Sequence, residues 1–213
     1  MSKVRVHIST SLDGYVAGPN QSHENPLGEG GERLHDWAVE LKAWREPHAI
    51  AGGEDNASNG VMAEENANVG AEIMGRGKFG PPSRGPWGDD PWLGWWGDDP
   101  PFHKPVFVVT HHEREPLRLS DTTFTFVTDG IESALAEARD AAGDKDVVIG
   151  GGADVINQFL AAGLVDEIEL HLAPVLLGGG ARLFAGAGTD VKLEQLRVVE
   201  APGVTHLKYR IVR

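Results

Sequence analysis

The sequence predicts an α/β fold in which a mixed, mostly parallel β-sheet carries helices on both faces. Short apolar segments typical of buried strands alternate along the chain with segments that repeat apolar residues at helical spacing. The chain then ends in two strand-like segments, residues 192–200 and 205–212, joined across Pro202 and Gly203, which predicts an antiparallel pair. With 213 residues the chain can bury a full core, and we expect a single domain over residues 1–213.

The first third of the chain predicts a strand, a loop, two helices and a second strand. Residues 3–10 alternate apolar and polar side chains, which is typical of a strand with one polar face. The loop SLDGYVAG follows at residues 11–18, and its place at a strand end suits a ligand lid. Residues 32–44 repeat apolar side chains at helical spacing and predict an amphipathic helix. A second helix is predicted over residues 61–69, and a short strand that breaks into a turn over residues 71–76.

Residues 80–104, which we call the tryptophan segment, read GPPSRGPWGDDPWLGWWGDDPPFHK. The pentamer Trp-Gly-Asp-Asp-Pro occurs in it twice, at residues 87–91 and 96–100. Its prolines and glycines forbid regular secondary structure, but its tryptophans would be costly to leave in water. We therefore expect an ordered, largely desolvated segment that packs over a pocket or a subunit interface.

The middle of the chain predicts two strands and a helix. Residues 105–110, PVFVVT, are almost all apolar and predict a central strand that is covered on both faces. Residues 124–128 predict a further short strand, and residues 131–142 predict the helix that follows it.

The stretch of residues 146–184, DVVIGGGADVINQFLAAGLVDEIELHLAPVLLGGGARLF, is the most informative part of the chain. It begins with a buried strand around residues 147–149 and continues into a helix whose apolar positions fall on one face. Gly163 ends that helix, and residues 167–172 alternate like a strand with one polar face. Three consecutive glycines, residues 150–152, lie where the helix begins.

Glycines at this point have two explanations. They allow backbone N–H groups to approach an anion such as a diphosphate, which the helix dipole also favours. A chain that only has to turn at this point would need glycine as well. The pattern is not the dinucleotide fingerprint G-x-G-x-x-G, because its sixth position is Val155, and no Lys-Ser or Lys-Thr pair follows as in a P-loop.

The composition excludes several classes of function. The 19 basic and 32 acidic residues give a net charge of −13, which argues against nonspecific binding to nucleic acid or to an anionic membrane. The absence of cysteine excludes disulfides, thiolate catalysis and cysteine-ligated zinc, and no His-Glu-x-x-His pattern is present, so we expect no metal. The sequence has no recognisable signal peptide or membrane-spanning run, and we expect a soluble, cytoplasmic protein.

Four sequence features together resemble the dihydrofolate-reductase-like superfamily. They are SLDGYVAG after the first strand, IMGR at residues 73–76, the strand that ends in Thr110 and His111, and the stretch 146–184. Within that superfamily the chain looks like stand-alone bacterial members of the branch of the C-terminal reductase domain of RibD, the riboflavin-biosynthesis deaminase-reductase. The resemblance spans nearly the whole chain. It implies a three-layer αβα fold, a homodimer and NADPH as hydride donor.

The resemblance also implies which residues form the site. The glycine turn would hold the cofactor diphosphate, the Met-Gly-Arg turn a cofactor phosphate, the end of the strand at residue 110 the adenosine half, and the SLDG loop the nicotinamide. The residues expected to bind the cofactor are Ala17, Gly18, Gly75, Arg76, Thr110, His111, Gly150, Gly151, Gly152 and Ala153. We expect NADPH to bind more tightly than NADH, because Arg76 offers donors to the 2′-phosphate.

The function predicted from this resemblance is an NADPH-dependent reductase that transfers a hydride to a small heterocyclic substrate. It resembles 5-amino-6-(5-phosphoribosylamino)uracil reductase or dihydrofolate reductase. The candidates for catalytic residues are Asp13 and Asp36, although Asp13 could instead cap a turn and Asp36 could be a solvated helix residue. The alternative is a nucleotide-binding or interaction protein without turnover, which would use the same glycine turn as a sensor or the tryptophan segment as a partner surface.

Overall fold

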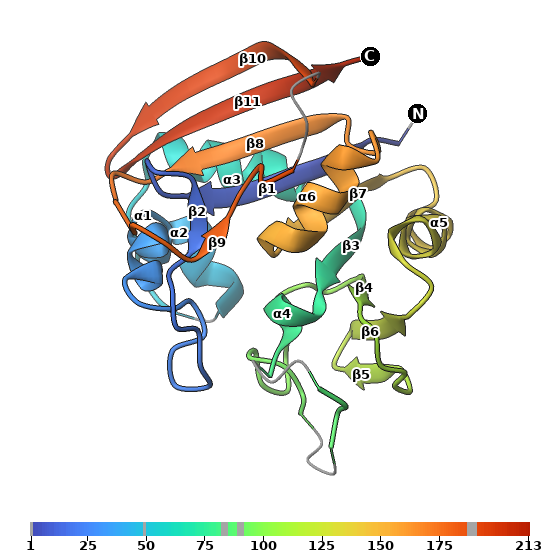
Figure 1. The fold of residues 1–213 in the computed structure, drawn as a ribbon. Coiled ribbons are helices and arrows are strands. Elements are labelled where there is room, and N and C mark those ends of the chain that lie inside the picture. Colours follow the sequence, from blue (N-terminus) through green and yellow to red (C-terminus); the bar gives the residue numbers. More distant parts are fainter. Residues whose placement is uncertain (1, 49, 82–84, 89–91, 187–190) are drawn as a thin grey trace.

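The computed structural model describes residues 2–48, 50–81, 85–88, 92–186 and 191–213, and its centre is one nine-stranded sheet (Figure 1). The strand order is β10-β11-β8-β1-β7-β3-β4-β6-β5. Strands from β8 to β6 are parallel to their neighbours, and antiparallel strands complete both edges. The bounds are β1 Val4–Thr10, β3 Val69–Gly75, β4 Pro105–Val109, β5 Leu117–Leu119, β6 Thr122–Val127, β7 Asp146–Gly151, β8 Glu167–Leu172, β10 Lys192–Ala201 and β11 Val204–Val212. A second, two-stranded sheet pairs β2 Tyr15–Ala17 with β9 Ala181–Arg182.

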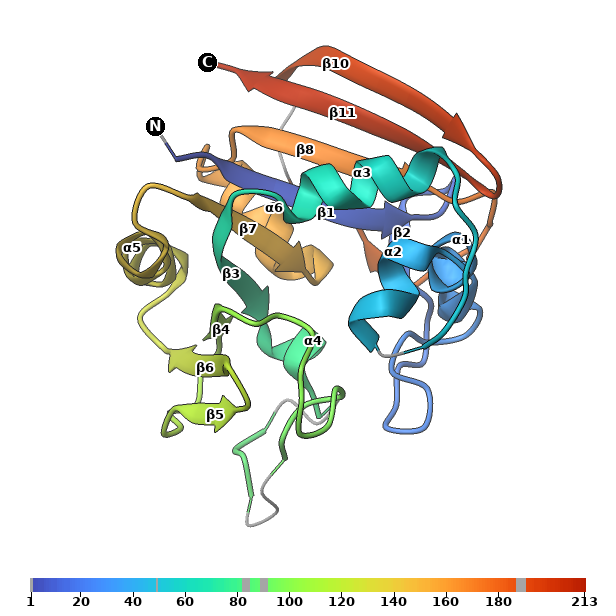
Figure 2. The same ribbon diagram turned by 180° about the vertical axis from the view of Figure 1, so that it is seen from behind.

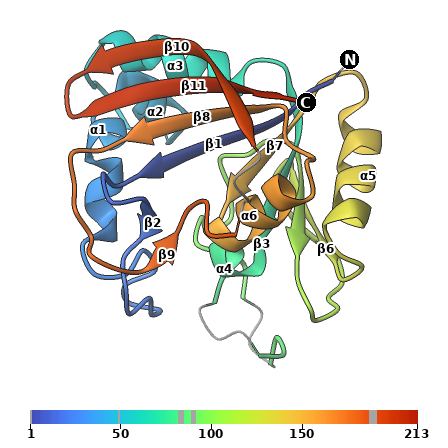
Figure 3. The same cartoon turned by 45° about the horizontal axis from the view of Figure 1, so that its top comes forward.

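Helices lie on both faces of the large sheet. Helices α5 Ile131–Ala142 and α6 Ala153–Ala161 cover one face (Figure 3), and α3 Ala57–Asn66 crosses the other (Figure 2). The remaining helical turns are η1 Gly31–His35, α1 Asp36–Val39, α2 Lys42–Arg45, η2 Glu46–His48 and α4 Arg76–Phe79. The predicted mixed, mostly parallel sheet between helical layers is confirmed. None of the helices in the described ranges is long and apolar enough to cross a membrane.

The face under α5 and α6 is apolar. Their buried residues, such as Leu135 and Phe159, pack on inward-facing side chains of β1, β3 and β7, including Val6 and Ile73. This is the arrangement that the helical spacing of the apolar residues predicts. The burial of these side chains, each worth about 1.5–3 kcal/mol, makes this face the main apolar core of the protein.

Helix α3 packs on the opposite face through polar side chains. Glu65 Oε1 lies 2.8 Å from His171 Nε2, and His171 Nδ1 lies 2.8 Å from His206 Nδ1. His206 Nε2 lies 2.9 Å from Ser58 Oγ, and the Trp37 ring lies against both imidazoles. When both imidazoles are neutral, one direction of donation satisfies this series of contacts. Ser58 donates to His206, His206 donates to His171, and His171 donates to the carboxylate of Glu65. Strand β1 presents its polar side chains to this face and its valines to the other.

Two predicted helices are corrected by the structure. The helix predicted over residues 32–44 is broken into η1, α1 and α2, because Leu41 leaves the helical conformation (ψ 142°) and forms a parallel bridge with Glu54. Leu41 is 1% exposed, so its burial depends on that bridge and not on a helix face. The helix predicted over residues 61–69 begins earlier, where the Asn56 side chain accepts from Ser58 N at 2.9 Å, and it ends at Asn66.

Residues 105–109 form β4, which is an interior strand as predicted but third from one edge of the sheet, and the middle strand of the sheet is β7. Its apolar sequence reflects cover on both sides, since Phe107 belongs to the core under α5 and Val106 and Val108 to a second apolar cluster on the other face. The sequence did not predict the edge strand β5.

The tryptophan segment packs on this second cluster of its own chain. Trp87, Trp92 and Trp96 lie against it, and two of their indole N–H groups donate to backbone oxygens, Trp87 to His112 (2.9 Å) and Trp92 to Phe79 (2.9 Å). Each ring is half-buried rather than largely desolvated. Residues 82–84 and 89–91 lie outside the described residues. The homodimer expected from this segment stays a prediction.

Candidate functional site at the carboxyl ends of the parallel strands

Most of the predicted site residues gather at one edge of the sheet. Strands β1, β7, β3 and β4 are adjacent and parallel, so their carboxyl ends meet there. The SLDG loop follows β1, the glycine turn ends β7, Gly75 ends β3 directly before Arg76, and Thr110 follows β4. In open α/β sheets the crevice outside these strand ends is where ligands bind.

The three glycines of the turn differ in what a side chain would meet at each position. A Cβ on Gly150 would lie 2.0 Å from Glu72 Oε1 and 2.8 Å from Lys78 Nζ, so a side chain at this position would displace the ends of these two side chains. Gly151 has a φ of +112°, which side chains rarely adopt. Gly152 has a φ of −73°, and a Cβ there would meet no heavy atom within 4 Å. The φ of Gly152 and the space around it do not require glycine at this position, whereas a ligand that approaches the backbone closely would require it.

The first turn of α6 follows directly. Ala153 is 4% exposed, so its methyl group faces the core and only its backbone can face the crevice. The N–H groups of the first helical residues have no partner within the helix, and Gly152 provides no side-chain cap. The glycine turn therefore leaves amides and open space together at the strand end, which is what binding of a diphosphate needs.

Lys78 is a site residue that the sequence did not reveal. Its Nζ donates to Gly150 O at 2.8 Å and forms an ion pair with Glu72 Oε1 at 3.0 Å. The lysine thus places a cation against the glycine turn. The only signal in the sequence is its position two residues after Arg76, in a turn that was already expected to meet phosphate.

Arg76 and Gly75 lie at the neighbouring strand end. The Arg76 guanidinium donates to the backbone oxygens of Gly80 and Pro81 and stacks on Trp87, with its Cζ 3.6 Å from the ring centroid. A Cβ on Gly75 would lie 2.7 Å from Val155 Cγ2, so glycine is needed there for packing against α6. Arg76 remains a phosphate contact by prediction, and the structure adds that its side chain also holds the start of the tryptophan segment.

Thr110 and His111, the residues predicted to lie beside the adenosine half of the cofactor, differ in exposure. Thr110 is 4% exposed, and its Oγ1 accepts from His112 N at 3.2 Å, so it fixes the turn after β4. His111 is exposed at the same turn. His111 is therefore the better placed of these two residues to meet a ligand through its side chain.

The SLDG loop is tied to a distant glycine-rich segment by Asp13. Its carboxylate accepts from Ser11 Oγ (2.6 Å), Gly178 N (2.6 Å) and Leu177 N (3.1 Å). The hydrogen bond from Ser11, followed by that from Gly178, lowers the pKa of Asp13 to about 2. Asp13 is therefore ionised at neutral pH, and its role as a catalytic residue stays a prediction. Its contacts make it a residue that positions the loop.

Ala17 and Gly18, the other loop residues, are packed within the protein. Ala17 is 5% exposed in β2, and a Cβ on Gly18 would lie 2.0 Å from Glu29 O. Their side chains do not face solvent, so contact with a cofactor would involve their backbone.

Asp36 begins α1 and is exposed to solvent. The neighbouring His35 is half-buried, and burial lowers its pKa, with the charges of Lys78 and His171 acting in the same direction. Its Nδ1 is buried and has no hydrogen-bond partner among the described residues. His35 was not predicted, because nothing in the sequence shows that it shares an environment with Lys78.

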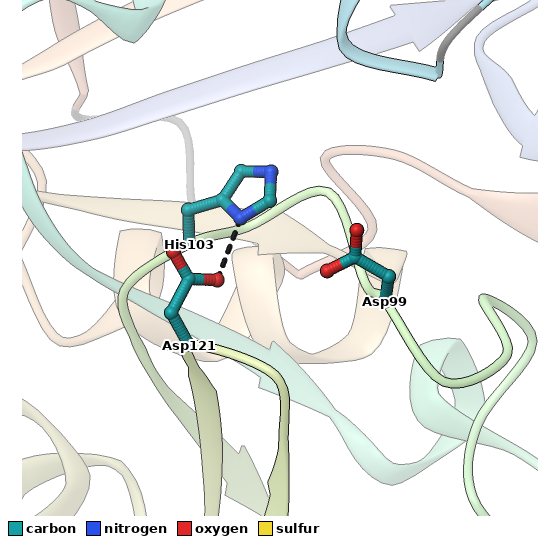
Figure 4. A group of neighbouring side chains, drawn as sticks. All are labelled: Asp99, His103 and Asp121. Atoms are coloured by element: carbon teal, nitrogen blue, oxygen red, sulfur yellow. Dashed lines mark hydrogen bonds and ion pairs between the residues drawn. The ribbon is translucent and has the colours of Figure 1, made fainter.

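A separate group of potential metal ligands lies on the surface. Asp99, His103 and Asp121 place ligand atoms within 4.8 Å of one another, and all three side chains are exposed (Figure 4). His103 Nδ1 and Asp121 Oδ1 are 2.6 Å apart. This hydrogen bond accounts for their proximity, and we assign no function to the group.

Comparison with known proteins places this geometry in a family. Residues 2–207 match the RibD C-terminal domain. The uncharacterized protein YyaP of Bacillus subtilis (strain 168) is 32% identical over 90 residues, which are 42% of this chain and 47% of YyaP. The chain spans about half of the length of the curated relatives that it matches.

Two solved structures resemble the fold. A putative riboflavin biosynthesis protein from Shewanella sp. PV-4 has a TM-score of 0.63 at 23% identity, with 99% of each chain covered. Dihydrofolate reductase from Enterococcus faecalis, complexed with NADP(H), has a TM-score of 0.50 at 12% identity, covering 98% of this chain and 96% of that chain. At these identities the likeness shows the fold alone, which is dihydrofolate-reductase-like. The match over residues 2–207 shows that the chain belongs to the family of the RibD C-terminal domain.

Proposed function

We propose that the protein is an NADPH-dependent reductase that transfers a hydride to a small heterocyclic substrate of the pyrimidine or pterin kind. The observation that carries this proposal is the glycine turn, in which Gly152 has open space above its backbone beside the first amides of α6. Family membership supports the same function, since related proteins include riboflavin biosynthesis reductases. Lys78, which is paired with Glu72, lies beside the turn and would donate to a diphosphate bound there.

In this proposal the residues of the chain bind and orient the reactants. The turn and the first amides of α6 would hold the diphosphate, while Lys78 offers a charge. The SLDG loop, held by Asp13 against Leu177 and Gly178, would border the nicotinamide, which supplies the hydride when it is bound. Asp36 stays the proposed proton donor, and the half-buried His35 beside it is a second candidate.

A non-catalytic nucleotide-binding protein is the second candidate function. It is favoured by the ionised state of Asp13, which removes one proton donor, and by the exposure of Asp36. Such a protein would bind the dinucleotide at the same turn but would not oxidise it.

We expect the protein to bind NADPH and to oxidise it when a pyrimidine or pterin acceptor is added. Calorimetric titration measures binding, and the loss of NADPH absorbance measures turnover. Asp36→Asn and His35→Gln should each retain NADPH affinity, and the variant that lacks the proton donor should lose turnover. Binding without turnover for every acceptor would support the non-catalytic protein, whereas failure to bind NADPH would overturn both proposals.

A further inference from the structure

Two segments that leave the sheet at different strands meet beyond its edge through aromatic rings. The imidazole of His23 lies 5.4 Å from the ring centroid of Trp92 and 5.7 Å from that of Trp95. The two indoles lie 4.6 Å apart with an interplanar angle of 79°. Ring pairs at such distances attract one another. We call these three residues the aromatic clasp.

The aromatic clasp joins the two sides of the candidate site. His23 belongs to the loop of residues 18–29, which continues from β2 on the side of β1, and the tryptophans belong to the segment that follows β3 and α4. The strand order β1-β7-β3 places the glycine turn, at the carboxyl end of β7, between these two sides. The loop and the described part of the tryptophan segment both extend past the sheet edge (Figure 1, Figure 2). Their contact therefore completes a closed path from β1 through β7 to β3 and back through the clasp.

The tryptophan side of the clasp is anchored to the core. Trp92 Nε1 donates to Phe79 O at 2.9 Å, and Phe79 is fully buried. Trp95 lies over the backbone of Gly80, where a Cβ would come within 2.8 Å of the indole. Phe79 and Gly80 directly follow Lys78, whose Nζ donates to the backbone of the glycine turn. Both indoles therefore lie on the same short turn that contacts the glycine turn.

The histidine side is a loop that is closed at its base and exposed at its tip. Gly18 N donates to Leu27 O at 2.8 Å. Glu29 N donates to Pro19 O at 2.9 Å. His23 lies between these pairs in the sequence and is exposed, although it contacts both indoles. A tip with so little buried surface can open locally at a small cost in free energy.

We propose that the aromatic clasp closes the candidate site, so that a ligand bound at the glycine turn leaves when His23 separates from the two indoles. The loop is the part that moves, because the tryptophans are anchored to the core and the histidine is exposed. Closure of this kind retains a ligand and excludes water from the reacting groups. The inference rests on the function proposed above for the identity of the ligand, NADPH. The clasp itself stands on the ring contacts.

The test measures the rate of NADPH release by stopped-flow fluorescence on the whole protein. His23→Ala should release NADPH about tenfold faster, as for the loss of two ring contacts of ordinary strength. His23→Phe keeps a ring at this position and should release NADPH at close to the unmodified rate. His48→Ala is the matched control, because His48 is also exposed and stacks on Trp44 with the ring centroids 4.0 Å apart, but outside the clasp. It should leave the rate unchanged, and thermal melting identifies any variant that fails to fold.

A second measurement does not need NADPH. The amides of residues 153–155, in the first turn of α6, have no partner within the helix and depend on solvent access for hydrogen exchange. In the free protein these amides should exchange faster in His23→Ala than in the unmodified protein or in His48→Ala.

NADPH that leaves His23→Ala at the unmodified rate would overturn the inference, and so would an equal acceleration in His48→Ala. If NADPH does not bind at all, the reductase proposal fails and hydrogen exchange decides on the clasp. Faster exchange at residues 153–155 in His23→Ala alone would then support it, whereas unchanged exchange would overturn it.

Discussion

Gly152→Val is expected to abolish dinucleotide binding and to leave the fold intact. A Cβ at this position would meet no heavy atom within 4 Å other than those of its chain neighbours, and the negative φ is compatible with a side chain. In the proposed complex the diphosphate lies against this backbone, so the valine methyl groups would occupy its place. We expect NADPH affinity to fall by more than about 100-fold, because a phosphate that cannot approach the amides loses most of their hydrogen bonds. Circular dichroism melting and NADPH titration on the same variant measure the two effects.

The neighbouring glycines provide the contrast. Gly151→Val forces a side chain into a positive φ, and Gly150→Val collides with Glu72, so both should lose stability together with binding. Gly60→Ala, in the exposed part of α3, should raise stability by about 1 kcal/mol and leave binding unchanged. A Gly152→Val protein that melts normally and still binds NADPH would show that the diphosphate lies elsewhere, and the reductase proposal would lose its main physical support.

Acidification is expected to destabilise the protein through the imidazoles under α3. His206 is 1% exposed, and burial lowers its pKa from 6.5 to about 4; protonation of the adjoining His171 acts in the same direction. The folded pKa lies below the unfolded one, so the unfolded chain binds more protons between about pH 6.5 and 4. The free energy of unfolding is therefore highest above pH 6.5 and falls by about 3 kcal/mol as the pH falls to 4. Burial also lowers the pKa of the half-buried His7 to about 4, so His7 contributes to the same loss of stability in acid.

Urea unfolding at a series of pH values measures this fall in the free energy of unfolding. His206→Leu should be less stable at pH 7, because it leaves Ser58 and His171 without their partner, but its stability should change less between pH 6.5 and 4. His48→Gln alters an exposed histidine and serves as the control. If His206→Leu loses as much stability between pH 6.5 and 4 as the unmodified protein, other groups cause the loss.

The sequence was a good guide where local pattern and tertiary packing agree. Helix α5 occupies the predicted residues, because Gly130 and Gly143, both at positive φ, stop the pattern at either end. Residues 32–44 show the opposite case. Their apolar spacing is helical, but Leu41 is held by Glu54, a pairing that depends on how the chain returns and is invisible in a local window.

The same distinction applies to the site. The glycine turn, the SLDG loop and the Met-Gly-Arg turn follow strands, and parallel pairing brings strand ends together, so their proximity could be predicted. Lys78 could not, since its role depends on a contact with Gly150 that is distant in the sequence. The role of Asp13 also depends on a distant partner, the amide of Gly178.

The polar packing of α3 means that the two sides of the sheet respond to different agents. Dissolved salt screens ion pairs such as Arg197 with Glu169 at the edge of this interface, while the aliphatic contacts under α5 are not weakened by screening. Salt and mild acid should therefore release α3 in a local opening that costs less than global unfolding, which amide hydrogen exchange would detect. Helix α3 leads within two residues into β3, the strand that ends at Gly75 just before Arg76, so this opening would loosen that strand end while the opposite layer remains closed.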